Sequence, residues 1–521
     1  MFNKVLIANR GEIAIRIARA AAALGVDTVG VHAPIDALSL HTKMVGRAVE
    51  LPAGGGDPVR AYLDIEAIVA AAVDTGCDAV HPGYGFLSEN AAFARRCAEA
   101  GVRFIGPEPE SLALFGDKVR ARAFARELKI PVIAGASAPL ASVEQAREVA
   151  ATVGYPVMLK AAAGGGGRGM RAVARPEEMA EAFARCQGEA EAAFGDRAVF
   201  LEKRVTRPRH IEVQVFGDHH GNVIHLRERD CSVQLRNQKV VEIAPAPNLA
   251  AAVRERILDD ALKLARAAKY RNAGTVEFLV DPQSGEHFFI ECNPRIQVEH
   301  TITEQVMGVD LVELQFRIAA GESLASLGLG EQQQVGEPRG YAIQARVVAT
   351  GTGVLSAYRE PSGPGVRVDG CGYLGLAPPP QFDPLLAKLI VQSNSSRTYE
   401  SAVDHTLRAP DEFHIAGVPT NAAQLRAILE HPAVRAGDAR TTLLAEVPGL
   451  ADGRPVAASI DAGSAPGAAG IALSFLDQQA AALGRAGGPG VRRPGAAAAP
   501  SLPVPDGELA VESPQSRTVG Q

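Results

Sequence analysis

Two glutamates in the segment TVEFLVDPQSGEHFFIEC (275–292) have a spacing that suits a metal ion. Asp-Pro-Gln-Ser-Gly is typical of a turn, so the segment predicts a β-hairpin. Pairing around that turn places Glu277 and Glu291 on one face, directly opposite or one diagonal step apart, and Asn293 shares the parity of Glu291. An exposed polar face is the alternative. We favour a hard divalent cation, because burying two adjacent carboxylates among apolar neighbours without a cation or proton is costly.

The octapeptide NPRIQVEH (293–300) follows at once and adds groups suited to an anion and a proton transfer. In an extended chain, Arg295, Gln297 and Glu299 alternate toward one side and can face one pocket. Arginine binds a carboxylate-like anion in a bidentate manner, and a neighbouring glutamate can accept a proton. A polar strand edge with an ion pair explains the same pattern equally well.

The segment RDCSVQLRNQKVVE (229–242) contributes three more polar candidates, Gln234, Arg236 and Lys239. Only ten of the 53 basic residues are lysines, so a lysine in such a segment is mildly informative. A surface helix or loop is the alternative interpretation of this segment.

The stretch MLKAAAGGGGRGM (158–170) places four glycines shortly after Lys160. It matches neither the P-loop nor the dinucleotide fingerprint. Backbone N–H groups in a glycine run can nevertheless approach phosphate oxygens without obstruction, and a nearby lysine supplies a compact positive charge. A flexible surface loop remains an alternative.

The elements that position these residues follow an α/β pattern. Strand-like and helix-like segments alternate over the first hundred residues, which predicts a doubly wound parallel sheet covered by helices. A mixed region follows, beginning with a helix near 118–130, and strands such as GYAIQARVVA and LLAKLIVQS begin again after about residue 336. From about 448 onward the composition shifts, and residues 461–521 are mostly Ala, Gly, Pro and Ser, which indicates a disordered tail or linker.

Composition limits the classes of function. The 521 residues carry a net charge of −6, so no global basic field points to nucleic acid. No apolar run reaches the length of a membrane span, which takes about 18 residues. The six cysteines lack C-x-x-C spacing, and Lys4 and Asn9 do not fit a signal peptide. We therefore expect a cytoplasmic protein without a zinc site, a disulfide framework or a membrane partner.

Taken together and in order, the motifs of residues 1 to about 447 resemble those of the biotin carboxylase family of ATP-grasp ligases. They are IANRGEIAIRI, HPGYGFLSEN (81–90), GDKVRAR (116–122), GYPVMLKAAAGGGGRGM, RHIEVQVFGD, ERDCSVQ, AGTVEFL, IECNPRIQVEHTITE and GVPTN (417–421). The resemblance implies an N-terminal α/β domain over 1–115, an ATP-grasp domain over 116–330 with a mobile lid at about 135–204, a C-terminal α+β domain over 331–447, and a tail or linker over 448–521.

The resemblance also implies an activity: ATP converts bicarbonate to carboxyphosphate, and biotin on a carrier protein is then carboxylated. By this resemblance Glu277 and Glu291, with Asn293 beside them, bind magnesium or manganese. The remaining ATP-site residues that it implies are Lys118 and Lys160 at the phosphates, Gly164, Gly165, Gly166 and Gly167 in the lid, Glu202 and Lys203 at the adenine edge, and His210 and Gln234.

The bicarbonate site implied by the resemblance comprises Lys239, Arg295, Gln297 and the backbone of Val298. Glu299 matches the general base that deprotonates bicarbonate, and Arg346 matches the arginine that stabilises the biotin enolate. Binding two anions together requires cations and a lid that excludes water.

The sequence departs from the family pattern at several positions. Asn237 and Leu235 replace a histidine and an arginine of the usual RRHQK run. The segment after Arg346 is several residues shorter than usual, which bears on the biotin pocket and on the family's dimer surface. Residues 44–47, MVGR, replace a usually acidic stretch.

No biotin attachment sequence is found, because no Met-Lys pair occurs in the chain. We therefore expect a biotin carboxyl carrier protein and a carboxyltransferase, either on separate chains or on a longer polypeptide, and a possible homodimer. We favour the biotin carboxylase component of an acyl-CoA (acetyl- or propionyl-CoA) carboxylase, as in fatty acid biosynthesis. The alternatives are a pyruvate-type carboxylase, another ATP-grasp ligase that joins a carboxylate to an amine, and a catalytically silent subunit.

Overall fold

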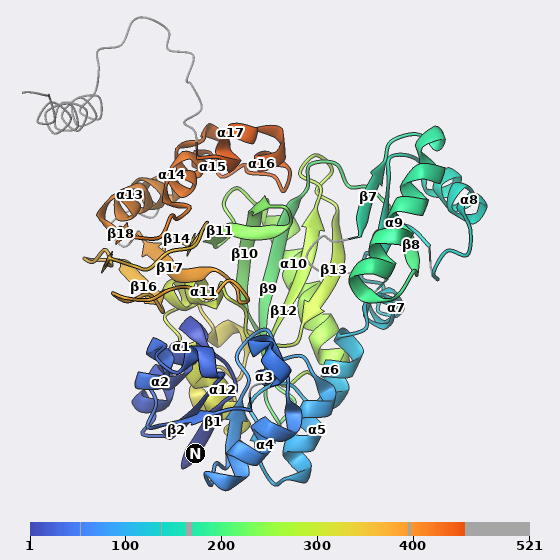
Figure 1. The fold of residues 1–521 in the computed structure, drawn as a ribbon. Helices are drawn as coiled ribbons and strands as arrows, with labels where there is room; N and C mark the ends of the chain where they lie inside the picture. The colour runs from blue at the N-terminus through green and yellow to red at the C-terminus, as the bar shows by residue number, and fades with distance from the viewer. Residues whose placement is uncertain (53, 137, 163–168, 394–397, 454–521) are drawn as a thin grey trace, which may run out of the picture. The chain divides into compact units, whose positions relative to one another are not determined.

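The computed structural model describes residues 1–453 apart from 53, 137, 163–168 and 394–397 (Figure 1). The four glycines Gly164 to Gly167 and the Ala/Gly/Pro-rich segment 454–521 therefore lie outside the described residues. Among the residues that are described, no helix is both long and apolar enough to cross a membrane.

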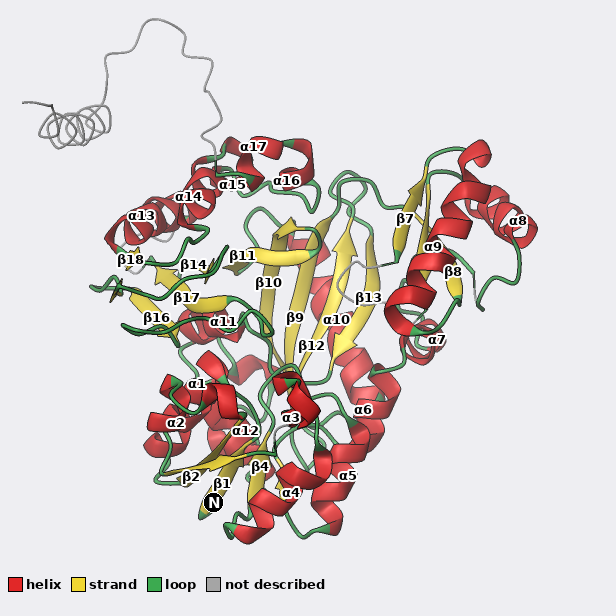
Figure 2. Ribbon diagram, in the orientation of Figure 1, coloured by secondary structure: helices red, strands yellow, loops and turns green. Residues whose placement is uncertain are grey.

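The first hundred residues form the parallel, helix-covered sheet that the alternating pattern predicts (Figure 2). Its strand order is β3-β2-β1-β4-β5, and alternate residues of β1 face opposite layers: Val5 and Ile7 pack with α1, whereas Leu6 packs with α4 and α5. The order reverses beside β1, which is where α/β sheets bind ligands. The elements are β1 (Lys4–Ile7), α1 (Gly11–Ala23), β2 (Asp27–His32), α2 (Leu40–Lys43), β3 (Arg47–Glu50), α3 (Pro58–Ala61), α4 (Ile65–Asp74), β4 (Ala79–His81), α5 (Ala91–Glu99), β5 (Arg103–Phe104) and α6 (Pro109–Phe115).

An eight-stranded antiparallel sheet forms the centre of the structure, in the order β13-β12-β9-β10-β11-β14-β17-β16. Strands from both sides of residue 331 belong to it, because β11 pairs with β14. Its strands are β9 (Arg209–Gly217), β10 (Val223–Leu235), β11 (Gln238–Ala244), β12 (Asn272–Val280), β13 (His287–Asn293), β14 (Ala342–Val348), β16 (Val366–Gly370) and β17 (Leu385–Gln392).

The two faces of this sheet differ in chemistry. On one face, apolar side chains such as Val213 pack against α10, and others such as Leu389 pack with residues of α13 and α14. The opposite face carries polar side chains at the alternate positions, including Glu212 and Arg346. The helices on and around this sheet are α10 (Ala251–Ala267), α11 (His300–Met307), α12 (Leu311–Ala319), α13 (Tyr399–Glu412), α14 (Ala422–Glu430), α15 (Pro432–Arg435), α16 (Leu443–Glu446) and α17 (Pro448–Ala451).

A smaller unit lies to one side of the central sheet in Figure 1 and has a hydrophobic core of its own. Its three strands have the order β7-β6-β8. The unit and the helix that precedes it comprise α7 (Lys118–Glu127), α8 (Val143–Val153), β6 (Val157–Ala161), β7 (Met170–Val173), α9 (Met179–Phe194) and β8 (Val199–Lys203). Lys160 near the end of β6 and Glu202 near the end of β8 therefore belong to one small sheet.

One alternative interpretation and one expectation were wrong. The segment 229–242 does not form the surface helix or loop of the alternative interpretation: it forms the β10–β11 hairpin, whose turn at Arg236 and Asn237 has φ values of 51° and 66°. Two left-handed residues match the twist of paired strands, and asparagine tolerates that conformation. The segment after Asn293 is not extended either, because the chain turns there and enters α11 directly after Glu299.

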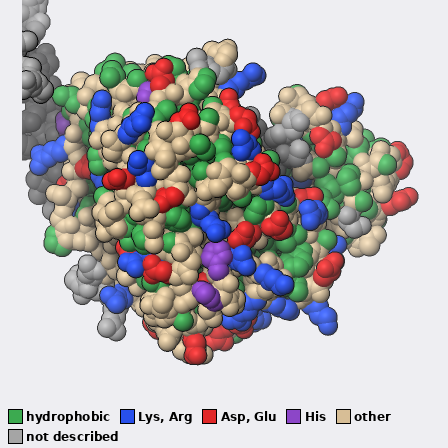
Figure 3. All heavy atoms as spheres, turned by 90° about the horizontal axis from the view of Figure 1, so that it is seen from below, with side chains coloured by type: hydrophobic (Ala, Val, Ile, Leu, Met, Phe, Trp, Pro, Cys, Tyr) green, Lys and Arg blue, Asp and Glu red, His purple; other side chains and the backbone are tan. Residues whose placement is uncertain are grey.

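Other differences lie at edges and ends. The short strand β3 was not anticipated, and its side chains are mostly exposed. β15 (Ala357–Arg359) pairs with β18 (His414–Ala416) in a separate two-stranded sheet. Pro448–Ala451 form α17, with Leu450 fully buried, so the packed part of the chain extends past residue 447. Acidic and basic side chains are interspersed on the face that Figure 3 shows.

Candidate active site

One cleft of about 1370 Å³ brings the predicted site residues together. Asn9 and Arg10, which follow β1, lie on its wall together with residues of the central sheet and of the β7-β6-β8 unit. The predicted residues that line it are Lys118, Lys160, Glu202, Lys203, His210, Gln234, Lys239, Glu277, Glu291, Asn293, Arg295, Gln297, Val298, Glu299 and Arg346. All predicted site residues within the described part of the chain therefore face this cleft.

A row of charged residues crosses four neighbouring strands, and Glu277 and Glu291 at one end of the row line the cleft. Arg229 of β10 pairs in register with Glu212 of β9, Glu212 pairs with Glu277 of β12, and Glu277 pairs with Glu291 of β13. Glu277 and Glu291 lie directly opposite each other, which is one of the two arrangements that the hairpin predicted. Glu212 and Arg229, which the sequence did not single out, extend the row on the other side.

Lys239 compensates three of the buried carboxylates. Its Nζ lies 2.5 Å from Glu212, 2.9 Å from Glu277 and 2.6 Å from Glu299. Burial alone would lower the pKa of Lys239, but the three carboxylates raise it well above its usual value. The ammonium group therefore stays charged. It links the strands β9, β11 and β12 of the central sheet to the turn that carries Glu299.

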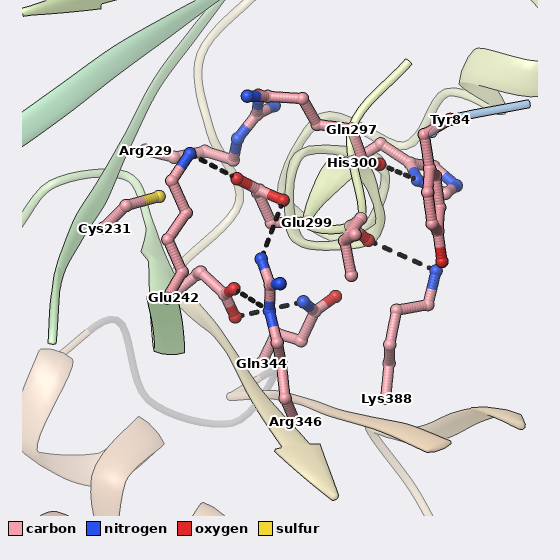
Figure 4. A network of polar contacts seen from close by, with 12 residues as sticks. Tyr84, Arg229, Cys231, Glu242, Gln297, Glu299, His300, Gln344, Arg346 and Lys388 are labelled. Atoms are coloured by element: carbon pink, nitrogen blue, oxygen red, sulfur yellow. Dashed lines mark hydrogen bonds and ion pairs between the residues drawn. The ribbon is translucent and has the colours of Figure 1, made fainter. Parts of the chain in front are cut away.

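Glu299 is buried between two cations (Figure 4). Besides Lys239, Arg346 Nη2 lies 3.1 Å from Glu299 Oε2, and Arg346 Nε donates to Glu242 at 2.5 Å. Burial would raise the pKa of Glu299, yet Lys239, Arg346 and Arg229 together hold it well below its usual range. A carboxylate in this state becomes a useful base only when a bound anion draws its cations away.

Glu277 and Glu291 have the chemistry of a site for a hard divalent cation. Glu277 accepts from Asn293 Nδ2 at 2.9 Å and lies 2.9 Å from His210 Nε2, whereas Glu291 Oε2 lies 3.1 Å from Lys118 Nζ. Opposed carboxylates on adjacent strands fit such a cation, which would replace these donors. Asn293 directs its amide nitrogen toward Glu277 and thus stands beside the pair.

Arg229 fixes the orientation of Gln297, a role that the sequence did not reveal. The fully buried guanidinium donates to Gln297 Oε1 at 2.8 Å and to Glu212 Oε1 at 2.6 Å. Because Gln297 accepts through its oxygen, its amide nitrogen must point the other way, where it donates to Glu277 at 2.9 Å. An anion in this part of the cleft would therefore meet an N–H donor.

Arg295 lies in the cleft but does not form the ion pair with Glu299 that alternation along an extended segment would allow. Its Nε donates to Glu89 at 2.6 Å, and its Nη2 donates to Asn293 Oδ1 at 3.2 Å. Glu89 comes from the motif HPGYGFLSEN, which was noted only for its resemblance. The chain turns after Asn293, so the alternation of an extended segment does not apply there, and Arg295 pairs with Glu89 and Asn293 instead.

In the β7-β6-β8 unit, the carboxylate of Glu202 contacts two cationic side chains. Lys160 Nζ lies 2.6 Å from Glu202 Oε2, and Arg122 of α7 also donates to Glu202. Lys203 donates to the carbonyl oxygens of Gly154 and Tyr155 at 2.9 Å each, so its ammonium group is held by the chain. In the central sheet, Gln234 Nε2 lies 2.8 Å from His210 Nδ1 and links these two residues.

Comparison with known proteins identifies the family. The chain matches the family models of the biotin carboxylase N-terminal domain (residues 1–112), the carbamoyl-phosphate synthase L chain ATP-binding domain (117–327) and the biotin carboxylase C-terminal domain (342–446). The biotin carboxylase domain of the Hydrogenobacter thermophilus 2-oxoglutarate carboxylase is 42% identical and superimposes with a TM-score of 0.81, over 86% of this chain and 98% of that one. The chain belongs to the biotin carboxylase family. The ATP-grasp fold and the assignment to an ATP-dependent ligase are thereby confirmed.

Several relatives within the biotin carboxylase family are pyruvate carboxylases. The pyruvate carboxylases of Pichia angusta and Homo sapiens are 49% and 47% identical, over 86% and 87% of this chain. The Rhizobium etli pyruvate carboxylase superimposes with a TM-score of 0.81 at 42% identity, over 88% of this chain and 41% of that one. The chain spans about 38% of the length of the Pichia angusta enzyme and of the Homo sapiens enzyme. These matches favour the pyruvate-type alternative over the acyl-CoA carboxylase that we expected from the sequence, and fatty acid biosynthesis is not supported.

Proposed function

We propose that this chain catalyses the ATP-dependent carboxylation of biotin with bicarbonate, as the biotin carboxylase part of a pyruvate-type carboxylase. The observation that supports it best is the convergence of Lys239 and Arg346 on Glu299, beside the paired carboxylates Glu277 and Glu291. The Hydrogenobacter relative was determined with MgADP and bicarbonate. A ligase that only joined a carboxylate to an amine would not need a bicarbonate site at this position.

In this proposal the nucleotide spans the small unit and the central sheet. Lys118 and Lys160 neutralise phosphate charge, and Gly164 to Gly167 supply backbone donors as the lid. Glu202, Lys203, His210 and Gln234 surround the rest of the nucleotide. Glu277 and Glu291 would hold Mg²⁺ or Mn²⁺, with Asn293 beside them, and would thereby place a positive charge against the phosphate oxygens.

Bicarbonate occupies the space between Lys239, Arg295, Gln297 and the Val298 backbone. Glu299 takes the hydroxyl proton of bicarbonate, an oxygen of the resulting anion attacks the γ-phosphorus of ATP, and the bond to the departing ADP breaks to give carboxyphosphate. When the anion attracts Lys239, the pKa of Glu299 rises, so substrate binding itself prepares the base. The carbon–oxygen bond of carboxyphosphate then breaks and releases phosphate, which takes the proton of the biotin ring nitrogen, and that nitrogen bonds to the freed carboxyl carbon. Arg346, held by Glu242, stabilises the enolate form of biotin during this step.

The proposal extends to partners and organisation. Biotin is delivered by a carrier, and a carboxyltransferase uses the product, either on separate chains or on a longer polypeptide. We retain a homodimer, the boundaries 1–115 and 116–330, and a cytoplasmic location as proposals. We extend the third domain from 331–447 to Ala451, because α17 is packed and Leu450 is buried. The Hydrogenobacter relative was described as a dimer.

The test is bicarbonate-dependent ATP cleavage stimulated by free biotin. The wild-type chain should show it with Mg²⁺ or Mn²⁺, and Glu299→Gln should lose it by about a hundredfold, since a positioned general base contributes that much or more. Activity with an amine acceptor and none with bicarbonate would contradict the proposal.

Once the native carrier and carboxyltransferase are purified with the chain, carboxylation of pyruvate, 2-oxoglutarate and acyl-CoAs should be compared. Acyl-CoA turnover without pyruvate turnover would overturn the pyruvate-type assignment.

A further inference from the structure

Two buried side chains hold the backbone on either side of Val298 (Figure 4). His300 Nδ1 lies 2.7 Å from the carbonyl oxygen of Gln297, and Lys388 Nζ donates to the carbonyl oxygen of Val298 at 3.2 Å. Neither side chain is exposed to solvent. His300 and Lys388 do not line the cleft, but the two peptide groups that they hold belong to residues that do.

The first contact determines the direction of a backbone donor. The carbonyl of Gln297 and the N–H of Val298 belong to one planar peptide group and point in opposite directions. A hydrogen bond from His300 to that carbonyl therefore fixes the direction of the Val298 N–H. A carbonyl oxygen can only accept, so His300 carries a proton on Nδ1. Burial, together with the nearby Lys388 and Arg16, lowers the pKa of His300 well below its usual value and keeps the ring neutral.

The second contact fixes the next peptide group, which joins Val298 to Glu299. Its carbonyl accepts from Lys388, so the chain enters Glu299 in one orientation. Lys388 is placed for this role because it lies directly opposite Arg346 in the β14–β17 pairing. The strand that presents Arg346 and the turn that presents Glu299 are thus tied together through one ammonium group.

Two carboxylates, those of Glu12 and Asp369, compensate the buried charge of Lys388. Its Nζ lies 3.0 Å from Glu12 of α1 and 3.9 Å from Asp369 of β16, and Tyr84 donates to the other oxygen of Glu12. A buried ammonium group needs such partners. The network therefore connects α1, the turn before α11 and the strands β16 and β17 at one point.

We propose that His300 and Lys388 are positioning residues for bicarbonate: they aim the Val298 N–H and the Glu299 carboxylate at the anion without touching it. This inference rests on the proposed function, because it assigns the anion near Val298. Small misplacements of such groups reduce binding and turnover strongly. The proposal therefore predicts a defect that is specific to bicarbonate and leaves ATP binding unchanged.

Replacement of His300 tests the first contact. His300→Leu removes the donor and should raise the KM for bicarbonate about tenfold while the KM for ATP changes little. His300→Asn places an amide nitrogen close to the position of Nδ1 and should restore most of the bicarbonate affinity. His287→Asn is the matched control, since His287 is also buried, lies 2.7 Å from Asp260 and does not line the cleft. An unchanged KM for bicarbonate in folded His300→Leu protein would overturn the role of His300, and so would equal rises in both KM values.

Lys388 needs a variant that keeps the buried charges balanced. Lys388→Met combined with Glu12→Gln removes one charge of each sign and should also raise the KM for bicarbonate, whereas Glu12→Gln alone should raise it less.

Bicarbonate-induced stabilisation in the absence of ATP, measured as a shift in Tm, provides a readout that needs no turnover. A wild-type chain without ATP cleavage would refute the proposed function alone. A bicarbonate Tm shift that survives unchanged in His300→Leu and in the double variant would refute the positioning role alone.

Discussion

Lys239 Nζ lies 2.6 Å from Glu299 Oε1, and the same ammonium group contacts Glu212 and Glu277. One lysine thus balances three carboxylates that have almost no contact with solvent. Removal of one partner from a buried ion pair leaves an uncompensated charge, which is more costly than never having formed the pair. The stability of the cleft should therefore depend on Lys239 more than on any exposed lysine.

Lys239→Met should lower the free energy of unfolding by about 3–5 kcal/mol at pH 8. The loss should be smaller at pH 5.5. Without Lys239 the pKa values of the buried carboxylates rise above those of the unfolded chain, so the folded variant binds protons as the pH falls and recovers stability. Urea unfolding of the variant and of wild type at both pH values measures this difference.

Two further variants test whether the stability loss in Lys239→Met comes from uncompensated buried carboxylates. Adding Glu212→Gln to Lys239→Met should recover part of the lost stability, because one of the uncompensated carboxylates is removed. Lys263→Met, at an exposed position of α10, should leave stability nearly unchanged at both pH values. If Lys239→Met lost the same free energy at pH 8 and at pH 5.5, the proposed charge balance would be wrong.

The sequence was informative wherever the relevant pairing was local. A short turn of typical composition joins β12 and β13, so the sequence placed Glu277 and Glu291 on one face, directly opposite or one diagonal step apart. An irregularity between Glu277 and Phe278 sets the register that makes the two glutamates opposite. Glu212 and Arg229 joined the row through pairings between β9, β10 and β12, which no local pattern reveals. Arg229 lies within ERDCSVQ, but nothing in that segment indicates that its guanidinium donates to Gln297.

Some signals in the sequence were present but not used. Lys388 stands inside LLAKLIVQS, which was predicted correctly as a strand, and a charged residue in such an apolar run must find a partner when buried. Its partners Glu12 and Asp369 are distant in sequence, so the network could not be assembled from the sequence. The orientation of Arg295 was missed because the chain turns after Asn293 instead of continuing as a strand.

Glu242→Gln should impair the biotin step and leave nucleotide binding intact. Glu242 is fully buried and accepts from Arg346 at 2.5 Å and from Gln344 at 3.0 Å, so it sets the position of the guanidinium. Loss of its charge should reduce biotin-dependent turnover about tenfold, the lower end of what outer partners of functional groups contribute. Steady-state kinetics with free biotin as the varied substrate measures the effect. A variant with normal biotin kinetics, or one with a raised KM for ATP only, would contradict the role of Glu242.

Two glycines of the small unit should respond in opposite ways to alanine. Gly169 has a φ of 68°, and a Cβ there would lie 2.7 Å from Ala161 Cβ, so Gly169→Ala should destabilise the unit by about 1–2 kcal/mol and raise the KM for ATP. Gly188 is exposed within α9 and a Cβ there meets nothing within 4 Å, so Gly188→Ala should stabilise it by about 0.5–1 kcal/mol. Thermal unfolding and ATP kinetics compare the two variants. Equal effects of both would refute the packing seen at Gly169.

His41 should make the chain less stable in mild acid. Its side chain is buried in α2, Nε2 lies 3.3 Å from the carbonyl oxygen of Val31, and burial lowers the pKa of His41 to about 4. The folded state keeps the ring neutral while the unfolded chain, with a pKa near 6.5, takes up the proton. Stability is therefore complete above pH 6.5 and is lost as the pH falls toward 4, by about 2 kcal/mol between pH 7 and pH 5.

The variant His41→Gln isolates this contribution, because its amide nitrogen can still donate to Val31 while the titratable ring is gone. Unfolding by urea at pH 7 and at pH 5 should show a smaller acid-induced loss in His41→Gln than in wild type, by about 2 kcal/mol. The other buried histidines contribute equally to both proteins and cancel. His414→Gln, at an exposed position of β18, should keep the pH dependence of wild type. An equal acid-induced loss in His41→Gln and wild type would show that His41 does not titrate between the two states as its burial requires.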